Sequence, residues 1–249
     1  PLEGPAEATD LYDKGAGEVT LTGGGDQTVA FQVVLDCPDG ATGLRLEWAA
    51  LTPAGGGKPL PPTVLRAWRA MPLRIESYPA WMPTVRDVRP GPLLDPLVPL
   101  ELLRAGIDVP PGGRAVFWVD LAIPADAEPG AYRGTVRAVS GDTAPADLPV
   151  VLEVRDYMLT RTGPVKAVGG LDHMDLFRAF VVSEDGRPFD PLGLDSRHQQ
   201  VRQGLQAVRS LALLARQHRL DLFDSGIRPL LKRRPDGSPL LEWADYDNI

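Results

Sequence analysis

The feature that most constrains the fold is an alternation of apolar and polar residues between Glu18 and Arg155. A period of two places one side of a strand in a core and the other side toward solvent. This alternation predicts a series of short β-strands, each with one buried face. The predicted buried faces are Val29/Phe31/Val33/Leu35, Leu44/Leu46/Trp48, Phe117/Val119/Leu121/Ile123, Tyr132/Gly134/Val136/Ala138 and Leu148/Val150/Leu152/Val154.

Turn-forming sequences separate these segments, and the chain contains 26 glycines and 26 prolines. The predicted turns are Gly23-Gly24-Gly25, Pro38-Asp39-Gly40, Gly55-Gly56-Gly57, Pro110-Pro111-Gly112-Gly113, Glu128-Pro129-Gly130 and Ser140-Gly141-Asp142. Glycine and proline favour tight turns between short strands. With no helical segment between the strands, the pattern predicts an antiparallel β-sandwich over residues 18–160, after a lead-in of residues 1–17. Residues 71–108 are rich in proline and glycine and are predicted to form an irregular extended segment.

The pattern changes after residue 160. An apolar run over residues 165–171 predicts a buried parallel strand, followed by a loop. A helix is predicted from about Ser196 to Leu220, and residues 220–223 form a second short strand. The apolar face of the helix is Val201, Leu205, Val208, Ala212 and Ala215. Strand, helix and strand in this order predict a βαβ unit.

One βαβ unit cannot bury both faces of its sheet. The chain is therefore a fragment, or it borrows a partner surface. The chain starts at Pro1 rather than Met, and the pattern breaks off after Trp243. We expect the chain to be the front portion of a longer product.

Composition excludes several classes of function. The formal net charge of −7 argues against a nucleic-acid partner, because phosphate binding requires clustered cations. Cys37 is the only cysteine, which excludes an internal disulfide and a cysteine-based metal site. No apolar run approaches the ~20 residues of a membrane span. Searches for a Gly-x-Ser-x-Gly elbow, a zinc-binding His-Glu-x-x-His helix and a Walker-type loop find none, so we expect no cofactor and no metal. The sequence leaves the oligomeric state open.

A set of segments in a fixed order resembles glycoside hydrolase family 123-like proteins, a group whose members often carry an uncharacterised C-terminal domain. The segments are residues 29–35 (VAFQVVL), 95–99 (DPLVP), 117–124 (FWVDLAIP), 125–136 (ADAEPGAYRGTV), 214–219 (LARQHR) and 243–247 (WADYD). The resemblance runs from Glu18 to the C-terminus. It implies a multi-domain protein with an N-terminal β-sandwich and a catalytic (β/α)8-type barrel, and hydrolysis of glycosides, with N-acetylgalactosaminides as the characterised case. On this resemblance, residues 161–249 are expected to be the beginning of that barrel, truncated before its sheet closes.

The resemblance also implies a secreted or periplasmic protein with a carbohydrate substrate. The catalytic pair of the family is an adjacent Asp-Glu on a middle barrel strand, and this chain contains no Asp-Glu dipeptide. No catalytic residue is therefore assigned, and the chain alone is expected to be inactive. The alternatives are a non-catalytic carbohydrate-binding or surface-scaffold protein, or a sandwich module for adhesion or assembly in which the βαβ resemblance is accidental.

Candidate sugar-binding residues follow the two predicted parallel strands, because barrel sites form at the carboxyl ends of the strands. Asp172 and His173 follow the first strand, and Asp224 follows the second. A carboxylate accepts hydrogen bonds from sugar hydroxyls, and a neutral imidazole both donates and accepts. The structural alternatives are that Asp172 caps a turn, that His173 lies on the rim, and that Asp224 opens an Asp-Ser-Gly turn.

Aromatic and histidine side chains complete the set of candidates. Trp81, in the irregular segment, is a candidate for stacking on a sugar ring. Trp48 and Trp118 lie within alternating strands, where we expect core aromatics. His198 and His218 are expected on the predicted helix, away from the carboxyl ends of the strands.

Overall fold

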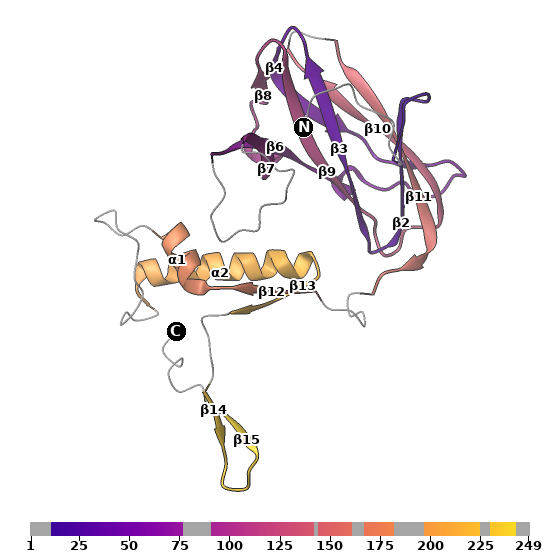
Figure 1. Cartoon of the computed structure of the whole chain (residues 1–249). Coiled ribbons are helices and arrows are strands. Elements are labelled where there is room, and N and C mark those ends of the chain that lie inside the picture. Colours follow the sequence, from indigo (N-terminus) through magenta and orange to yellow (C-terminus); the bar gives the residue numbers. More distant parts are fainter. Residues whose placement is uncertain are drawn as a thin grey trace. The chain divides into compact units, whose positions relative to one another are not determined.

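The computed structural model describes residues 11–76, 91–141, 144–160, 167–181, 197–224 and 230–242. The chain divides into two compact units, Pro1–Thr160 and Arg161–Ile249. In the described residues, the first unit is built from β-strands and the second contains both α-helices (Figure 1).

The first unit consists of two β-sheets. The larger sheet has seven strands in the order β1-β2-β11-β10-β4-β8, with β5 also paired to β10, and the smaller has four in the order β3-β9-β6-β7. The larger sheet contains β1 (Tyr12–Asp13), β2 (Glu18–Gly25), β4 (Ala41–Trp48), β5 (Thr52–Pro53), β8 (Ile107–Val109), β10 (Gly130–Val139) and β11 (Ala146–Met158). The smaller sheet contains β3 (Thr28–Cys37), β6 (Leu65–Ile75), β7 (Gly91–Pro99) and β9 (Gly113–Ala122). Outside the sheets, the unit has two short 3-10 helices, η1 (Pro62–Val64) and η2 (Leu100–Leu102).

Both sheets contribute to one hydrophobic core. Phe117 and Val119 of β9 in the smaller sheet and Leu152 of β11 in the larger sheet are all completely buried in it. The five buried faces predicted from the alternation supply most of this core. Two sheets on a shared core form a β-sandwich, and the predicted sandwich is confirmed. Burial of each large apolar side chain contributes roughly 1.5–3 kcal/mol.

The sandwich is mixed rather than antiparallel, so that part of the prediction is wrong. Strand β2 pairs with β11 in parallel, with Val19 opposite Val150 and Gly23 opposite Val154. No hairpin joins these two strands, and the rest of the sandwich supplies the long crossover that a parallel pair requires. The predicted turn at Gly23-Gly24-Gly25 is instead the end of β2. A side chain at Gly24 would overlap the backbone oxygen of Tyr157, so glycine is required there.

The predicted irregular segment over residues 71–108 also contains regular structure. Strands β6 and β7 form an antiparallel pair with Trp68 opposite Pro99, and β8 pairs with β4. Strand β7 lies at the edge of its sheet. An edge strand tolerates proline because one side of its backbone needs no hydrogen-bond partner, and this explains a strand with the sequence GPLLDPLVP.

The second unit contains the predicted strand, helix and strand. Strands β12 (Ala167–Leu171) and β13 (Leu220–Asp224) pair in parallel, and α2 (Gln199–Gln217) precedes β13. A hairpin of β14 (Leu230–Arg233) and β15 (Pro239–Glu242) follows. The loop predicted after the first strand is wrong in part, because α1 (His173–Phe180) begins there. No helix in the described part of the chain is long and apolar enough to cross a membrane.

Candidate functional site

The carboxyl ends of β12 and β13 lie at one edge of their two-stranded sheet. The parallel register pairs Leu171, the last residue of β12, with Asp224, the last residue of β13. Asp172 and His173 follow β12 directly and open α1. Parallel α/β sheets bind ligands at this edge, because the loops that leave the strands gather there.

Asp172 has a defined role at this edge. Its carboxylate oxygen Oδ1 accepts a hydrogen bond of 2.9 Å from the backbone N–H of Met174, and Asp172 is therefore the N-cap of α1. This is the structural alternative for Asp172, here capping a helix rather than a turn. A cap uses one carboxylate oxygen, and the other oxygen can accept from a ligand hydroxyl.

His173 is held against α1 and is half-buried. Its ring meets Phe177 edge-on, with ring centroids 6.4 Å apart and an interplanar angle of 88°. Phe177 is buried with Val181 of the same segment and Val201 of α2. A side chain at Gly204 would overlap the Phe177 ring, so glycine lets the two helices approach closely. This contact fixes α1, and with it the position of Asp172 and His173.

The structure describes some of the remaining candidate residues fully and others only in part or not at all. The backbone of Asp224 lies at the same sheet edge, and its side chain is outside the described residues. Trp81 lies outside the described residues. His198 is the N-cap residue of α2 and precedes Val201, which packs on Phe177 of α1. The expectation that His198 lies away from the carboxyl ends of the strands is therefore wrong, whereas His218 is the C-cap residue at the opposite end of the helix.

The described residues at this edge offer groups that can form hydrogen bonds with a ligand. A carboxylate and an imidazole, both half-buried, supply a hydrogen-bond acceptor and a group that donates or accepts. Within the described ranges, no three His, Cys, Asp or Glu side chains gather closely enough to hold a metal ion. Cys37 lies in the sandwich core, and burial raises the pKa of its thiol.

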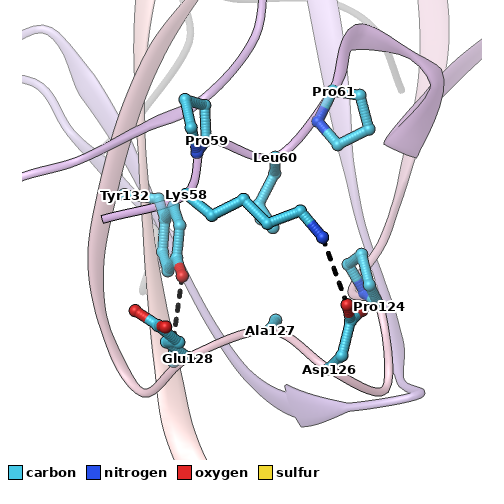
Figure 2. Close-up of a pocket in the computed structure, with 9 residues that line it drawn as sticks. All are labelled: Lys58, Pro59, Leu60, Pro61, Pro124, Asp126, Ala127, Glu128 and Tyr132. Atoms are coloured by element: carbon cyan, nitrogen blue, oxygen red, sulfur yellow. Dashed lines mark hydrogen bonds and ion pairs between the residues drawn. The ribbon is translucent and has the colours of Figure 1, made fainter. Parts of the chain in front are cut away.

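The sandwich also has a hollow on its surface, shown in Figure 2. It has an empty volume of about 330 Å³, including space open to solvent, and lies between residues 58–61 and 124–128. Lys58 spans it, with its Nζ 3.3 Å from Oδ2 of Asp126. These two side chains are 78% and 76% exposed, and such an ion pair contributes little to stability.

The wall of this hollow has a structural explanation. Tyr132 is buried and donates a hydrogen bond of 3.0 Å from its hydroxyl to the backbone oxygen of Glu128. A tyrosine that bonds back to the backbone a few residues upstream is a corner typical of β-sandwiches. The hydrogen bond holds the Glu128-Pro129-Gly130 turn against the core. We assign the hollow to this corner rather than to a ligand site.

The two strand tryptophans differ in their surroundings. Trp48 packs against the core as predicted, and its indole Nε1 donates a 2.9 Å hydrogen bond to the backbone oxygen of Pro62. Trp118 is not part of the core cluster, so the expectation of a core aromatic is wrong there. Its neighbours Phe117 and Val119 occupy the core face of β9, and successive side chains on a strand point to opposite faces.

Comparison with known proteins finds similarity in structure only. No protein-family model and no curated protein matches the chain. Among solved structures, a family 123 glycoside hydrolase from Clostridium perfringens, studied for hydrolysis of glycolipid glycans, aligns with a TM-score of 0.62 and 10% identity. The alignment covers 92% of this chain and 39% of the enzyme. The chain thus spans about two fifths of that enzyme's length.

Two further structures align less well. A Bacteroides ovatus GH5 xyloglucanase aligns over 67% of this chain and 27% of its own, with a TM-score of 0.25 and 9% identity. A PapD-like domain of human CEP192 aligns over 63% of this chain and 99% of its own, with a TM-score of 0.27 and 8% identity. With TM-scores this low, neither alignment supports a statement about the fold or function of this chain. The first alignment, at 10% identity, shows a distant likeness of fold to a glycoside hydrolase.

Proposed function

We propose that this chain is the N-terminal part of a secreted or periplasmic glycoside hydrolase that acts on glycans. The observation that carries the proposal is the match of 92% of the chain, with a TM-score of 0.62, to a family 123 enzyme. In this proposal the second unit begins a (β/α)8-type barrel, and the catalytic carboxylates lie beyond residue 249.

The uncovered apolar surface of the second unit supports the barrel. Parallel strands are almost always buried on both faces. In β13, Leu220 and Leu222 are half-buried, whereas Asp221 and Phe223 on the opposite face are exposed. Further strands and helices of a barrel would cover Phe223 and the exposed Val168 of β12.

In this proposal the sugar binds at the carboxyl ends of β12 and β13. Asp172 accepts a hydrogen bond from a sugar hydroxyl through the carboxylate oxygen that the cap does not use, and His173 and Asp224 contact the same ligand. Trp81 lies outside the described residues and stays a predicted sugar-stacking residue. The reaction itself requires two carboxyl groups that act on an oxocarbenium-like transition state.

The proposal is tested by measuring turnover of aryl N-acetylhexosaminides and glycolipid oligosaccharides. We expect hydrolysis by the natural protein that carries this chain, and none by residues 1–249 above a heat-denatured control. In the natural protein, Asp172→Ala should raise KM, with Asp175→Ala, in the same first turn of α1, as the matched control. Hydrolysis by residues 1–249 alone, or no hydrolysis by the natural protein, would refute the proposal. Glycan binding without turnover would favour a non-catalytic carbohydrate-binding protein.

A further inference from the structure

The outer face of the smaller sheet carries two tryptophans side by side. Trp118 of β9 is directly opposite Trp68 of β6 and, on its other side, opposite Gln32 of β3. The core residues of β9 alternate with Trp118, so this row of side chains points away from the core. We call the outward surface formed by Gln32, Arg66, Trp68, Trp118 and Asp120 the tryptophan face.

The indole of Trp118 is fixed in orientation. Its Nε1 donates a hydrogen bond of 2.7 Å to Oδ1 of Asp120, two residues further along the same strand and on the same face. A side chain that reaches a residue two positions along a strand must lie along the strand instead of standing away from the sheet. One face of the ring is then turned to the sheet and the other is turned outward, which agrees with the partial exposure of Trp118.

Polar groups lie beside the two rings on the side of Asp120, whereas the same-face neighbours on the other side, Val116 and Ala70, are buried and apolar. Arg66 is opposite Asp120 on the neighbouring strand, and Arg66 and Gln32 are exposed. Together they offer a guanidinium donor, a carboxylate acceptor and an amide that does both. The row Gln32, Trp118, Trp68 and Pro99 crosses four strands, which at ~4.8 Å per strand is about 14 Å, long enough for a short oligosaccharide.

These features select one class of ligand. A sugar presents apolar C–H groups on its ring face and hydroxyl groups on its edge, and it needs a flat aromatic surface with donors and acceptors beside it. A nucleic acid is disfavoured by Asp120 in the face and by the net charge of −7. A protein partner would instead use the exposed aliphatic residues of the same sheet, Val34 (38% exposed) and Leu97 (45% exposed).

We propose that the tryptophan face binds an uncharged oligosaccharide, with the Trp118 ring against a sugar ring and Gln32, Arg66 and Asp120 bonded to its hydroxyls. This site lies in the sandwich and is separate from the residues at the carboxyl ends of β12 and β13. It rests on the proposed function only for the expectation that the ligand is a glycan. It does not require that the protein hydrolyse the ligand.

The test measures binding by the chain of residues 1–249. Four families of oligosaccharide are titrated by calorimetry: N-acetylgalactosamine-terminated, chito-, cello- and xylo-oligosaccharides. Trp118→Ala removes the flat ring and should weaken binding at least about tenfold. Gln32→Ala removes one hydrogen-bonding group from an exposed position and should weaken binding about fivefold. Leu97→Ala is the matched control on the same sheet and should leave binding unchanged.

The outcomes separate this inference from the proposed function. Binding that is weakened by Trp118→Ala and Gln32→Ala supports it even if the natural protein hydrolyses nothing. Circular dichroism checks the fold of each variant, and Gln32→Ala carries the test if Trp118→Ala does not fold. The inference is overturned if no oligosaccharide of the four families binds, or if binding survives both substitutions. A loss with Leu97→Ala as large as with Trp118→Ala would also overturn it, because the loss would then not depend on the residues of the tryptophan face.

Discussion

The two units of the chain bury their apolar residues to very different degrees. In the sandwich, two sheets contribute to a single core that contains completely buried Phe117, Val119 and Leu152. In the described residues of the second unit, the buried cluster is Phe177, Val181 and Val201, and Leu205 and Val208 are partly buried beside it. Val168 and Phe223 of its sheet remain 59% and 55% exposed.

This difference in burial arises from the number of packed layers of secondary structure in each unit, and not from the amino-acid composition. The sandwich has a second sheet to cover the apolar face of the first, so each strand needs only one buried face. In the second unit, α2 contacts β13, and the opposite face of the parallel pair is exposed. Exposed Leu213 and Leu214 on α2 add to this uncovered surface. We therefore expect the folding free energy to be concentrated in the sandwich.

Separating the two units should give the largest effect. Residues 11–160 alone should unfold in one cooperative transition, because their core is complete. Residues 161–249 alone should show no cooperative transition, because in the described residues Val168 and Phe223 on one face of the parallel pair are exposed and have no second layer over them. Differential scanning calorimetry of the two fragments measures both. A sharp calorimetric transition of residues 161–249 alone would contradict the expectation that the folding free energy is concentrated in the sandwich.

A large truncation in the sandwich core tests the same contrast at one residue. Phe117→Ala should reduce the free energy of unfolding by about 3–5 kcal/mol, as for other buried phenylalanines. Phe177→Ala removes the same side chain from the second unit and should leave the main transition unchanged. Urea unfolding followed by tryptophan fluorescence reports mainly the first unit, because four of the five tryptophans belong to it and only Trp243 belongs to the second. Equal shifts for both variants would show that the units unfold together.

A smaller effect is expected where α1 meets α2. Gly204→Ala places a methyl group into the Phe177 ring, which outweighs the gain in helix propensity of about 1 kcal/mol. Overpacking of this kind costs about 1–3 kcal/mol locally. The variant should be cleaved faster by protease after residue 172, with the sandwich intact. Ser210→Ala, at an exposed position of the same helix, is the matched control and should not change the cleavage rate.

The features that local sequence determines could be predicted. Strand faces are set by residues two apart, so the buried faces and the Glu128-Pro129-Gly130 turn follow from short segments. The outward position of Trp118 could also have been predicted from the alternation of the sequence. Trp118 is out of phase with the buried Phe117 and Val119, whereas Trp48 is in phase with Leu44 and Leu46. The expectation that Trp118 is a core aromatic did not take this difference in phase into account.

Other features depend on parts of the chain that are distant in sequence. The parallel pairing of β2 with β11 is fixed by the tertiary packing, and no local pattern contains it. Helix α1 is short, and Phe177 is its only fully buried side chain, so its periodicity is weak. The sequence pattern that indicates the start of α1 is Asp172 followed three residues later by Asp175. An acidic residue in the first turn favours the start of a helix. The contact between Phe177 and Gly204 could not be predicted from either segment alone.

The smallest effect is expected at an exposed ion pair between β10 and β11. Arg137 donates two hydrogen bonds, of 2.6 Å and 2.7 Å, to the carboxylate of Asp147, its direct cross-strand partner. These bonds lower the pKa of Asp147 in the folded protein. The stabilisation is therefore present above the unfolded-state pKa of Asp147, and it is lost as the pH falls through the lowered folded-state pKa.

Asp147→Asn should slightly lower the melting temperature at pH 7, because both partners are about half exposed and water screens the pair. The difference from the unmodified protein should disappear as the pH falls below the pKa of Asp147, where the unmodified carboxyl group is itself neutral. Thermal melts at a series of pH values measure this, with Glu153→Gln on the same strand as the control. A difference that persists unchanged at low pH would mean that Asp147 stabilises the strand pair by something other than its charge.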